Sequence, residues 1–258
     1  MDTAVAISPV ARTRWTPPPM PQRNATAASV PPTPSLQPGR GAMLGFDPVQ
    51  AAMVERVGAT RIHVRKGVTL FRAGERSSAL YAIRFGSFKT QIVTNDGHEQ
   101  VSGYHMTGDV IGSDGIGGSV HDCEAVALED AEVCALPFER VEALAREDAG
   151  FQRSVHRVLA GEIARERGVM VMLGTMRAEQ RLASFLIDLA RRYHERGYSG
   201  SEFVLRMTRE EIGSHLGLTL ETVSRLFSRF RDSGWIDVRG RLVKLVDRAA
   251  LRRIILAG

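Results

Sequence analysis

Three polar residues near the C-terminus have the types and spacing needed to read DNA bases. Glu221, Ser224 and Arg225 share one face of a helix predicted over 220–230. A carboxylate accepts a hydrogen bond from the N4 amino group of cytosine, and an arginine donates two to O6 and N7 of guanine. Residues four apart on a helix are neighbours, so Glu221 and Arg225 can reach adjacent base pairs or pair with each other. This spacing predicts recognition in the major groove.

The elements around this face predict a helix-turn-helix. Apolar residues recur on the opposite face at spacings of three and four, namely Leu220, Val223, Leu226, Phe227 and Phe230. Thr219 can cap this helix. Upstream, 208–216 predicts a short helix with a capping box of Thr208 and Glu211. A tight turn containing Gly217 joins the two helices, as in a helix-turn-helix.

A hairpin predicted over 235–246, with Arg239, Gly240 and Arg241 at its tip, would complete a winged helix. Helix N-termini and basic side chains hold phosphates without reading sequence. We expect phosphate contacts at Thr208, Arg209, Thr219, Arg229, Arg241 and Lys244. An ordinary pair of helices packed in a core remains the alternative, and it leaves the polar face unexplained.

Composition restricts the class of protein. The 258 residues include 34 Lys+Arg and 29 Asp+Glu, a net charge of +5, so DNA contact requires a local basic patch. No apolar run reaches the ~18 residues of a membrane helix. The N-terminus has no apolar core typical of a signal peptide. Two cysteines suit a reducing compartment. We expect a soluble, cytoplasmic protein without membrane contact.

Three further segments precede the predicted helix-turn-helix. Residues 1–42 hold most of the 11 prolines, which predicts a disordered tail. Short strand-like runs with regular turns over about 59–138 predict a small sandwich or barrel. A long helix is predicted over about 151–175, and a further helix over 181–197.

The long helix has the pattern of a dimer seam. The residues near one face are Val155, Leu159, Ile163, Glu166, Met170 and Leu173. An intramolecular bridge is the alternative. Glu162 and Glu166 would repel their counterparts across a two-fold axis, and Arg165 and Arg167 could pair with them across or along the helices.

Taken together, these elements resemble the family of the cyclic-AMP receptor protein and the fumarate-nitrate reduction regulator, the Crp/Fnr family. The resemblance covers about 45–255 and is closest to the fumarate-nitrate branch. It rests on segments 70–90, 98–112, 132–138, 181–199 and 207–230. It implies an α+β fold with a disordered tail at 1–42, a β-roll sensor domain at 43–148, a dimerisation helix at 149–176 and a winged helix-turn-helix at 177–258.

The resemblance also implies partners. Glu221, Ser224 and Arg225 match family positions that read half-sites of the TTGAT kind. A homodimer would then bind a TTGAT-N4-ATCAA palindrome, with its recognition helices one DNA turn apart. The turn at 94–99 resembles a family loop that touches RNA polymerase, which makes Asp96, Gly97 and His98 candidates for an activating surface. A plain exposed turn is the alternative.

Family ligands match these residues poorly. Cyclic-AMP receptors use a Gly-Glu and an Arg-Ser pair, where this chain has Ser113 and Cys123-Glu124. The oxygen-labile iron–sulfur cluster needs four thiolates. Only Cys134 matches one of them, and 1–42 contains no cysteine. We therefore expect neither cyclic AMP nor a cluster.

The signal itself stays open in the sequence. Cys134 is a buried strand residue or a redox switch, and Cys123 beside His121 is a weak candidate for redox or metal chemistry. Conceivable haem ligands are His63, His98, His105 and Met106. Control by abundance and an unidentified ligand both remain.

Two other function classes fit the sequence less well. A cupin-type enzyme would need two histidines one residue apart, and none of the seven histidines has that spacing. Phosphate-loop and nucleophile motifs are also missing from the sequence. An interaction module without DNA binding would leave the Glu221, Ser224 and Arg225 face without a role. We expect a protein that is not an enzyme and holds no resident metal.

Overall fold

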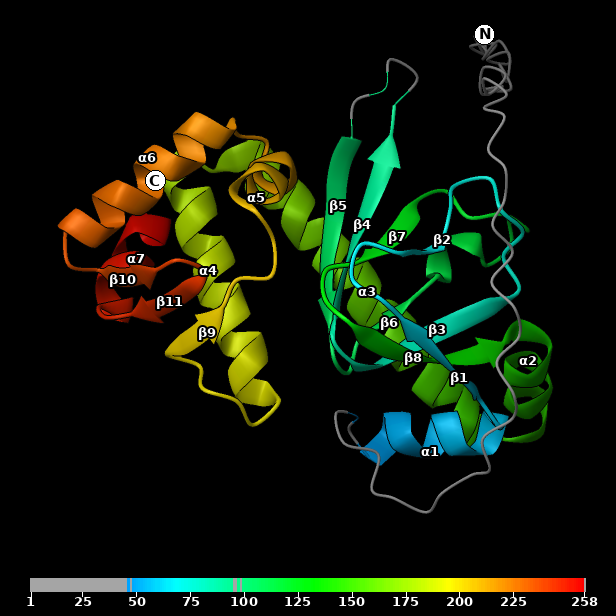
Figure 1. The fold of residues 1–258 in the computed structure, drawn as a ribbon. Helices are drawn as coiled ribbons and strands as arrows, with labels where there is room; N and C mark the ends of the chain where they lie inside the picture. The colour runs from blue at the N-terminus through cyan, green and yellow to red at the C-terminus, as the bar shows by residue number, and fades with distance from the viewer. Residues whose placement is uncertain (1–45, 47, 95–96, 98, 258) are drawn as a thin grey trace, which may run out of the picture. The chain divides into compact units, whose positions relative to one another are not determined.

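A computed structural model of the protein describes residues 46, 48–94, 97 and 99–257 (Figure 1). The tail predicted to be disordered, 1–42, lies outside these residues. Within them the chain forms, in order, a β-roll, one long helix and a helical domain with a small sheet. This is the α+β architecture expected from the sequence.

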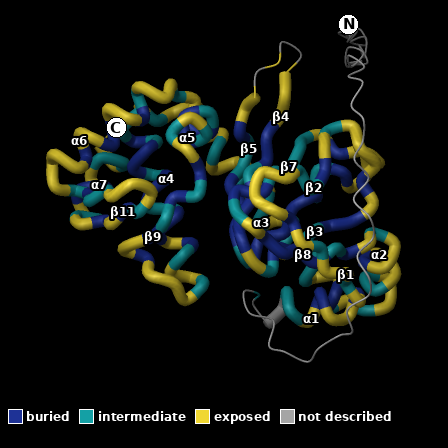
Figure 2. Tube along the Cα trace, in the orientation of Figure 1, coloured by how far each residue is buried: buried dark blue, intermediate teal, exposed yellow. Residues whose placement is uncertain are grey.

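The β-roll consists of two four-stranded antiparallel sheets, ordered β1-β8-β3-β6 and β2-β7-β4-β5. The strands are β1 Thr60–Val64, β2 Thr69–Phe71, β3 Ala79–Phe85, β4 Ser87–Val93, β5 Glu99–Met106, β6 Val110–Ile111, β7 Glu124–Ala127 and β8 Ala131–Pro137. Six of them lie where the sequence predicts strands. The short β2 and β6 were missed, because two or three residues show no alternation. Ile83 and Phe88 are fully buried and belong to the roll's core. Buried segments run along the strands of the roll (Figure 2).

Gly86 allows the sharp turn between β3 and β4. Its φ of 92° lies in the left-handed region, which favours glycine. A Cβ at this position would also lie 2.6 Å from the Ala131 Cβ. The turn therefore requires glycine for both its backbone conformation and its space.

Two short helices that the sequence analysis missed cover one end of the roll. They are α1 Pro48–Val57 and α2 Phe138–Glu147. Buried residues of α1, including Met53 and Val57, share a core with Leu80, Cys134 and Phe151. Both helices bury apolar residues in this core, which they share with strands of the roll.

The long helix α3 spans Ala149–Thr175, two residues earlier than predicted. It begins there because the Asp148 carboxylate caps it, accepting from the N–H groups of Gly150 and Phe151 at 2.6 and 3.2 Å. Asp148 also pairs with Arg56 of α1 at 2.6 Å. The N-terminus of α3 is thus attached to the roll.

The C-terminal domain is a winged helix-turn-helix. Its elements are α4 Ala178–Glu195, β9 Glu202–Val204, α5 Arg209–Leu216, α6 Leu220–Asp232, β10 Ile236–Arg239, β11 Leu242–Leu245 and α7 Arg248–Leu256. The hairpin β10–β11 turns at Gly240, whose φ is 62°, as the sequence predicts. Strand β9, which pairs with β11, and helix α7 were not predicted.

One hydrophobic core joins the roll to the C-terminal domain. Val101, Tyr104 and Met106 of β5 belong to the same buried cluster as Leu186 of α4 and Phe230 of α6. β5 is therefore packed against the winged helix-turn-helix of its own chain. Among the described helices, none is long and apolar enough to cross a membrane.

Candidate nucleic-acid interface

Helix α6 buries one face and presents the other. Val223, Leu226, Phe227 and Phe230 are buried in the shared core. Leu220, predicted on the same apolar stripe, is instead 46% exposed. The first turn of α6 extends beyond the core, whose α6 members begin at Val223.

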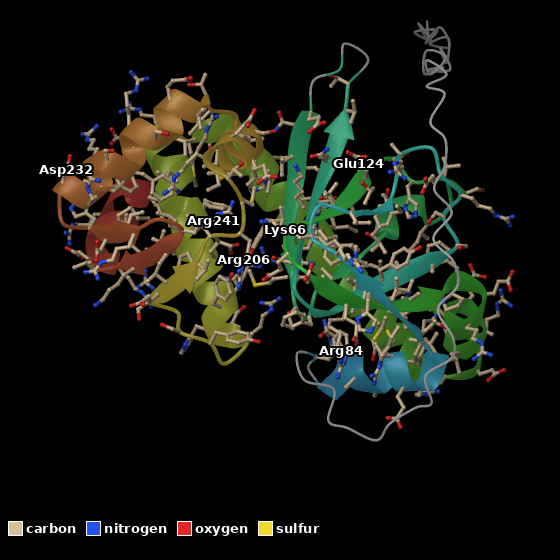
Figure 3. All side chains as sticks on the ribbon, in the orientation of Figure 1. Lys66, Arg84, Glu124, Arg206, Asp232 and Arg241 are labelled. Atoms are coloured by element: carbon tan, nitrogen blue, oxygen red, sulfur yellow. The ribbon has the colours of Figure 1, made fainter. Side chains whose placement is uncertain are left out.

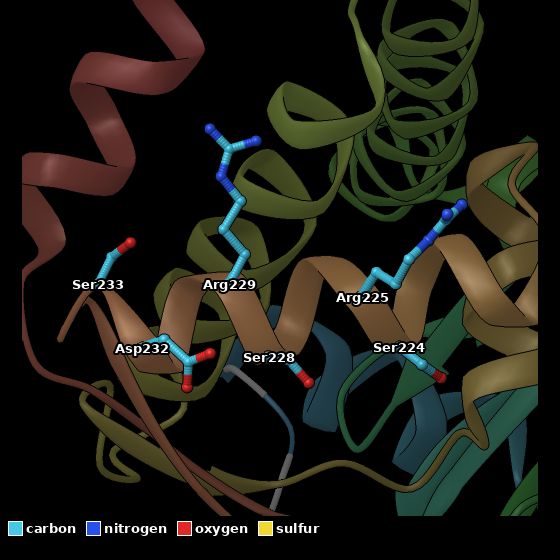
Figure 4. Close-up of a pocket in the computed structure, with 6 residues that line it drawn as sticks. All are labelled: Ser224, Arg225, Ser228, Arg229, Asp232 and Ser233. Carbon is cyan, nitrogen blue, oxygen red and sulfur yellow. The ribbon is translucent and has the colours of Figure 1, made fainter.

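The residues predicted to read bases are all on the exposed side. Glu221, Ser224 and Arg225 are exposed. Arg225 and Arg229 project from one edge of α6, and Ser224 and Ser228 from the other (Figure 4). This exposed face is available to an incoming major groove.

An open depression of about 560 Å³ runs along this face, lined by Ser224, Arg225, Ser228, Arg229, Asp232 and Ser233. Its lining combines two arginines, three hydroxyls and one carboxylate. Asp232 was not among the predicted residues, because one acid at a helix end shows no pattern by itself. Its carboxylate accepts from Arg231 at 3.0 Å, so this charge is compensated.

Glu221 and Arg225 do not form the ion pair that their four-residue spacing allowed. No ion pair between them occurs among the described contacts. The backbone N–H of Glu221 and the Thr219 hydroxyl lower the pKa of the Glu221 carboxyl. Arg225 makes a long contact of 3.4 Å to the Thr222 hydroxyl. Neither side chain forms an ion pair among the described contacts, and both are exposed to a ligand.

Both helix caps predicted from the sequence are present. The Thr208 hydroxyl accepts from the N–H of Glu211 at 3.1 Å, and the Glu211 carboxylate accepts from the N–H of Thr208 at 2.7 Å. The Thr219 hydroxyl accepts from the N–H of Thr222 at 3.2 Å. Both threonines are exposed at helix N-termini, where anions are favoured.

The basic residues predicted to hold phosphate differ in their surroundings. The Arg209 guanidinium lies 3.2 Å from the centre of the Phe227 ring, and burial lowers its pKa to about 10. On the wing, Lys244 is exposed, and Arg241 donates to the Arg206 carbonyl at 3.2 Å (Figure 3). Arg206 itself pairs with Glu129 of the roll at 3.1 Å. Lys244 and Arg241 thus remain accessible, while Arg209 also packs against the core.

Glu179 of α4 forms an ion pair with Arg229, so its carboxylate competes with DNA phosphate for this predicted phosphate ligand. We expect Glu179→Gln to raise DNA affinity about two- to fivefold, the scale of an exposed ion pair. The substitution frees Arg229 and removes a negative charge beside the approaching phosphate. Anisotropy titrations at several salt concentrations measure the change.

Glu195→Gln is the matched control, because Glu195 forms its ion pair with Arg191 at the other end of α4, at 2.7 Å. Equal affinities for Glu179→Gln, Glu195→Gln and the wild type would show that Arg229 does not contact phosphate.

The residues of the predicted dimer seam separate into two groups. Ile163, Glu166 and Met170 are exposed on α3. Val155 and Leu173 are half-buried and pack against cores of the same chain. Leu159 is also half-buried.

The charged residues of α3 pair along the helix. Arg165 forms an ion pair with Glu162. Burial, together with Glu162 and Asp114, raises the pKa of Glu166. Beside these charges, α3 exposes apolar surface at Ile163 and Met170.

The candidate sensing residues do not assemble into one site. Cys134 is buried on β8, and burial raises the pKa of its thiol. Burial and the nearby Asp114 carboxylate raise the pKa of Cys123, whose thiol lies 3.4 Å from that carboxylate. No group of three metal-ligating side chains occurs among the residues that the structure describes.

The described haem candidates lie on two different strands of the roll. His63 is exposed on β1, whereas His105 and Met106 are buried on β5. Asp96 and His98 lie outside the described residues. Gly97 is exposed in the turn after β4.

A β-roll, a long helix and a winged helix-turn-helix with an exposed polar recognition face define a DNA-binding transcription regulator. Family models agree, since a Crp-like helix-turn-helix domain matches residues 180–254 and a cyclic nucleotide-binding domain matches 61–148.

Relatives and a solved structure support the same class. The chain is 45% identical to the transcriptional regulatory protein btr of Bordetella pertussis, over 76% of this chain and 81% of that protein. It is 41% identical to the fumarate and nitrate reduction regulatory protein of Escherichia coli, over 74% and 76%. The structure of FixK2 from Bradyrhizobium japonicum matches with a TM-score of 0.70 and 30% identity, over 76% of this chain and 96% of that one. The chain belongs to the Crp/Fnr family of transcription regulators.

Proposed function

We propose that the protein binds a TTGAT-N4-ATCAA palindrome as a homodimer. The observation that carries this proposal is the exposed face of α6, where Glu221, Ser224 and Arg225 form no ion pair among the described contacts. Arg225 donates to the guanine of each half-site, and Glu221 accepts from the cytosine of the neighbouring base pair. The N-termini of α5 and α6, Arg229 and the wing hold the flanking phosphates.

The proposed dimer forms along α3. Exposed Ile163 and Met170 supply apolar surface on a helix of 27 residues. A two-fold axis along this helix presents the same residues of both chains to each other. It also relates the two recognition helices, which matches an inverted repeat in the DNA.

We further propose that the β4–β5 hairpin contacts RNA polymerase through its tip. Its two strands run from Ser87 to Val93 and from Glu99 to Met106, and Gly97 is exposed between them. An exposed Gly97 lets this tip meet a second protein bound beside the palindrome. This position supports an activating role.

The proposed regulator works without a resident iron–sulfur cluster or cyclic AMP. The chain contains two cysteines, half the thiolates that a four-iron cluster uses. Cys134 is in addition buried within a strand of the roll. Glu124 stands near the position of the Arg-Ser pair that binds cyclic phosphate, and it accepts from Gln91 at 2.5 Å. A carboxylate at that position repels a cyclic phosphate.

The test is an anisotropy titration of the aerobically purified, metal-free protein onto a TTGAT-N4-ATCAA duplex, with a scrambled duplex as control. We expect selective binding that survives moderate salt, because non-specific phosphate contacts weaken steeply as salt rises. Equal binding to both duplexes would contradict either the assigned half-site sequence or the proposal that the protein binds DNA without a ligand. Selection from a random DNA pool, with and without oxygen, separates these two explanations.

A further inference from the structure

A buried carboxylate connects the β-roll to both α3 and α4. Asp109, in the turn between β5 and β6, has a side chain that is 1% exposed. Its Oδ2 accepts from the Met106 N–H at 2.8 Å and from Arg192 at 2.5 Å. Its Oδ1 accepts from Arg196 at 2.7 Å and lies 3.8 Å from an Arg165 nitrogen. Arg192 of α4, Arg196 immediately after α4, and Arg165 of α3 thus converge on a single carboxylate.

Arg192 and Arg196 also donate hydrogen bonds to backbone carbonyl groups near Asp109. Arg192 donates to the Tyr104 carbonyl at 2.9 Å, and Arg196 donates to the Thr107 carbonyl. Charge-assisted hydrogen bonds are stronger and more directional than neutral ones, particularly where water is excluded. These bonds therefore fix the direction of α4 against the roll, beyond what apolar packing alone would specify.

The carboxylate is ionised in this environment. Burial would raise the pKa of Asp109, but Arg192, Arg196 and Arg165 more than offset this effect and hold the pKa below its usual range. Arg165 is in turn paired with Glu162 on its own helix. The cluster therefore keeps its charges at neutral pH.

A second set of contacts binds α5 to strands β4 and β5 of the roll. Lys89 of β4 pairs with Glu211 at 2.8 Å. The Ser214 hydroxyl accepts from the Val101 N–H at 2.8 Å and donates to the Glu99 carbonyl at 3.0 Å. Both helices that carry α6 are therefore bound to the roll, and the Asp109 cluster extends this connection to α3.

We infer that Asp109 is a positioning residue that sets which half-site spacing the dimer accepts. This inference rests on the proposed binding of a palindrome by a dimer joined along α3. Half-sites one helical turn apart lie about 34–36 Å from centre to centre, and each added base pair both moves and rotates the second site. A rigid link from α3 through Asp109 to α4 holds α6 at one separation, whereas a loosened link lets the recognition helices adjust.

The test compares binding to palindromes with central spacers of three, four, five and six base pairs. We expect the wild type to favour the four-base-pair spacer by about tenfold or more, equivalent to about 1.4 kcal/mol. In Asp109→Asn, which keeps the size and removes the charge, this preference should fall to about threefold or less, equivalent to about 0.65 kcal/mol. Binding to a single half-site should change much less than the spacing preference.

Two further variants make the outcome decisive. Arg196→Gln weakens the cluster from α4 while Arg192 still pairs with Asp109, so it tests the same link if Asp109→Asn fails to fold. Glu195→Gln, which removes an ion pair with Arg191 and keeps every hydrogen bond to Asp109, should keep the wild-type preference. Thermal unfolding identifies the folded variants.

An unchanged spacing preference in a folded Asp109→Asn or Arg196→Gln would overturn the inference. A uniform loss of affinity at every spacer would do the same, because it would indicate a merely structural role. Wild-type protein that selects none of the palindromes would overturn the proposed function, and the inference with it.

Discussion

Arg225→Ala is expected to remove the preference for guanine in the half-site. A bidentate arginine–guanine contact contributes about 1–3 kcal/mol of discrimination, so selectivity at that position should fall roughly five- to 150-fold. Arg225 is exposed and makes only one long side-chain contact, so its loss leaves the fold intact. Anisotropy titrations against duplexes that carry each of the four base pairs at this position measure the change.

Arg231→Ala is the matched control, since Arg231 lies on the same helix and pairs with Asp232. It should weaken binding slightly and equally for all four duplexes. Glu221→Ala should relax selectivity at the neighbouring base pair, with non-specific affinity equal or stronger because a negative charge is lost. Unchanged guanine preference in Arg225→Ala would refute the assigned role.

Met170→Asp is expected to prevent dimerisation. Met170 is 71% exposed in the single chain, and burying such a side chain contributes about 1.5–3 kcal/mol. In a two-fold symmetric dimer both chains lose the burial of this side chain, and the two introduced carboxylates lie near each other. Dimerisation should therefore weaken by at least about 3 kcal/mol, roughly a hundredfold. Sedimentation at several protein concentrations measures it.

Leu256→Asp controls for the introduced charge, because Leu256 is 82% exposed at the end of α7 and is not a residue of α3. It should leave dimerisation unchanged. The dimer variant should also lose its preference for the palindrome over a single half-site. A Met170→Asp protein that still dimerises like the wild type would place the seam elsewhere.

Local sequence determined the elements of the recognition module. Thr208 with Glu211, and Thr219, specify helix starts through side-chain bonds to backbone groups three residues away. The period of Val223, Leu226 and Phe230 specifies the buried face, which leaves Glu221, Ser224 and Arg225 on the other side. Such patterns can be recognised in the sequence because the interacting residues lie within one or two helical turns.

Elements whose structure depends on contacts with residues distant in the chain could not be predicted from the sequence. The short strands β2 and β6 carry too few residues to show a period, and helix α1 buries Met53 and Val57 in a core shared with the roll. Leu220 fits the apolar period but is exposed, because the core ends before it. The four-residue spacing of Glu221 and Arg225 permitted an ion pair, whereas each side chain instead lies near a threonine.

The sequence by itself therefore determined the class of protein, the recognition helix and its polar face, because these depend on residues close together in the chain. Only the tertiary structure decided how that helix is held. Asp109 meets Arg192 across 83 residues, and Ser214 meets Glu99 across 115. No local pattern specifies such pairs, since folding alone brings a turn of the roll against the arginines of α4.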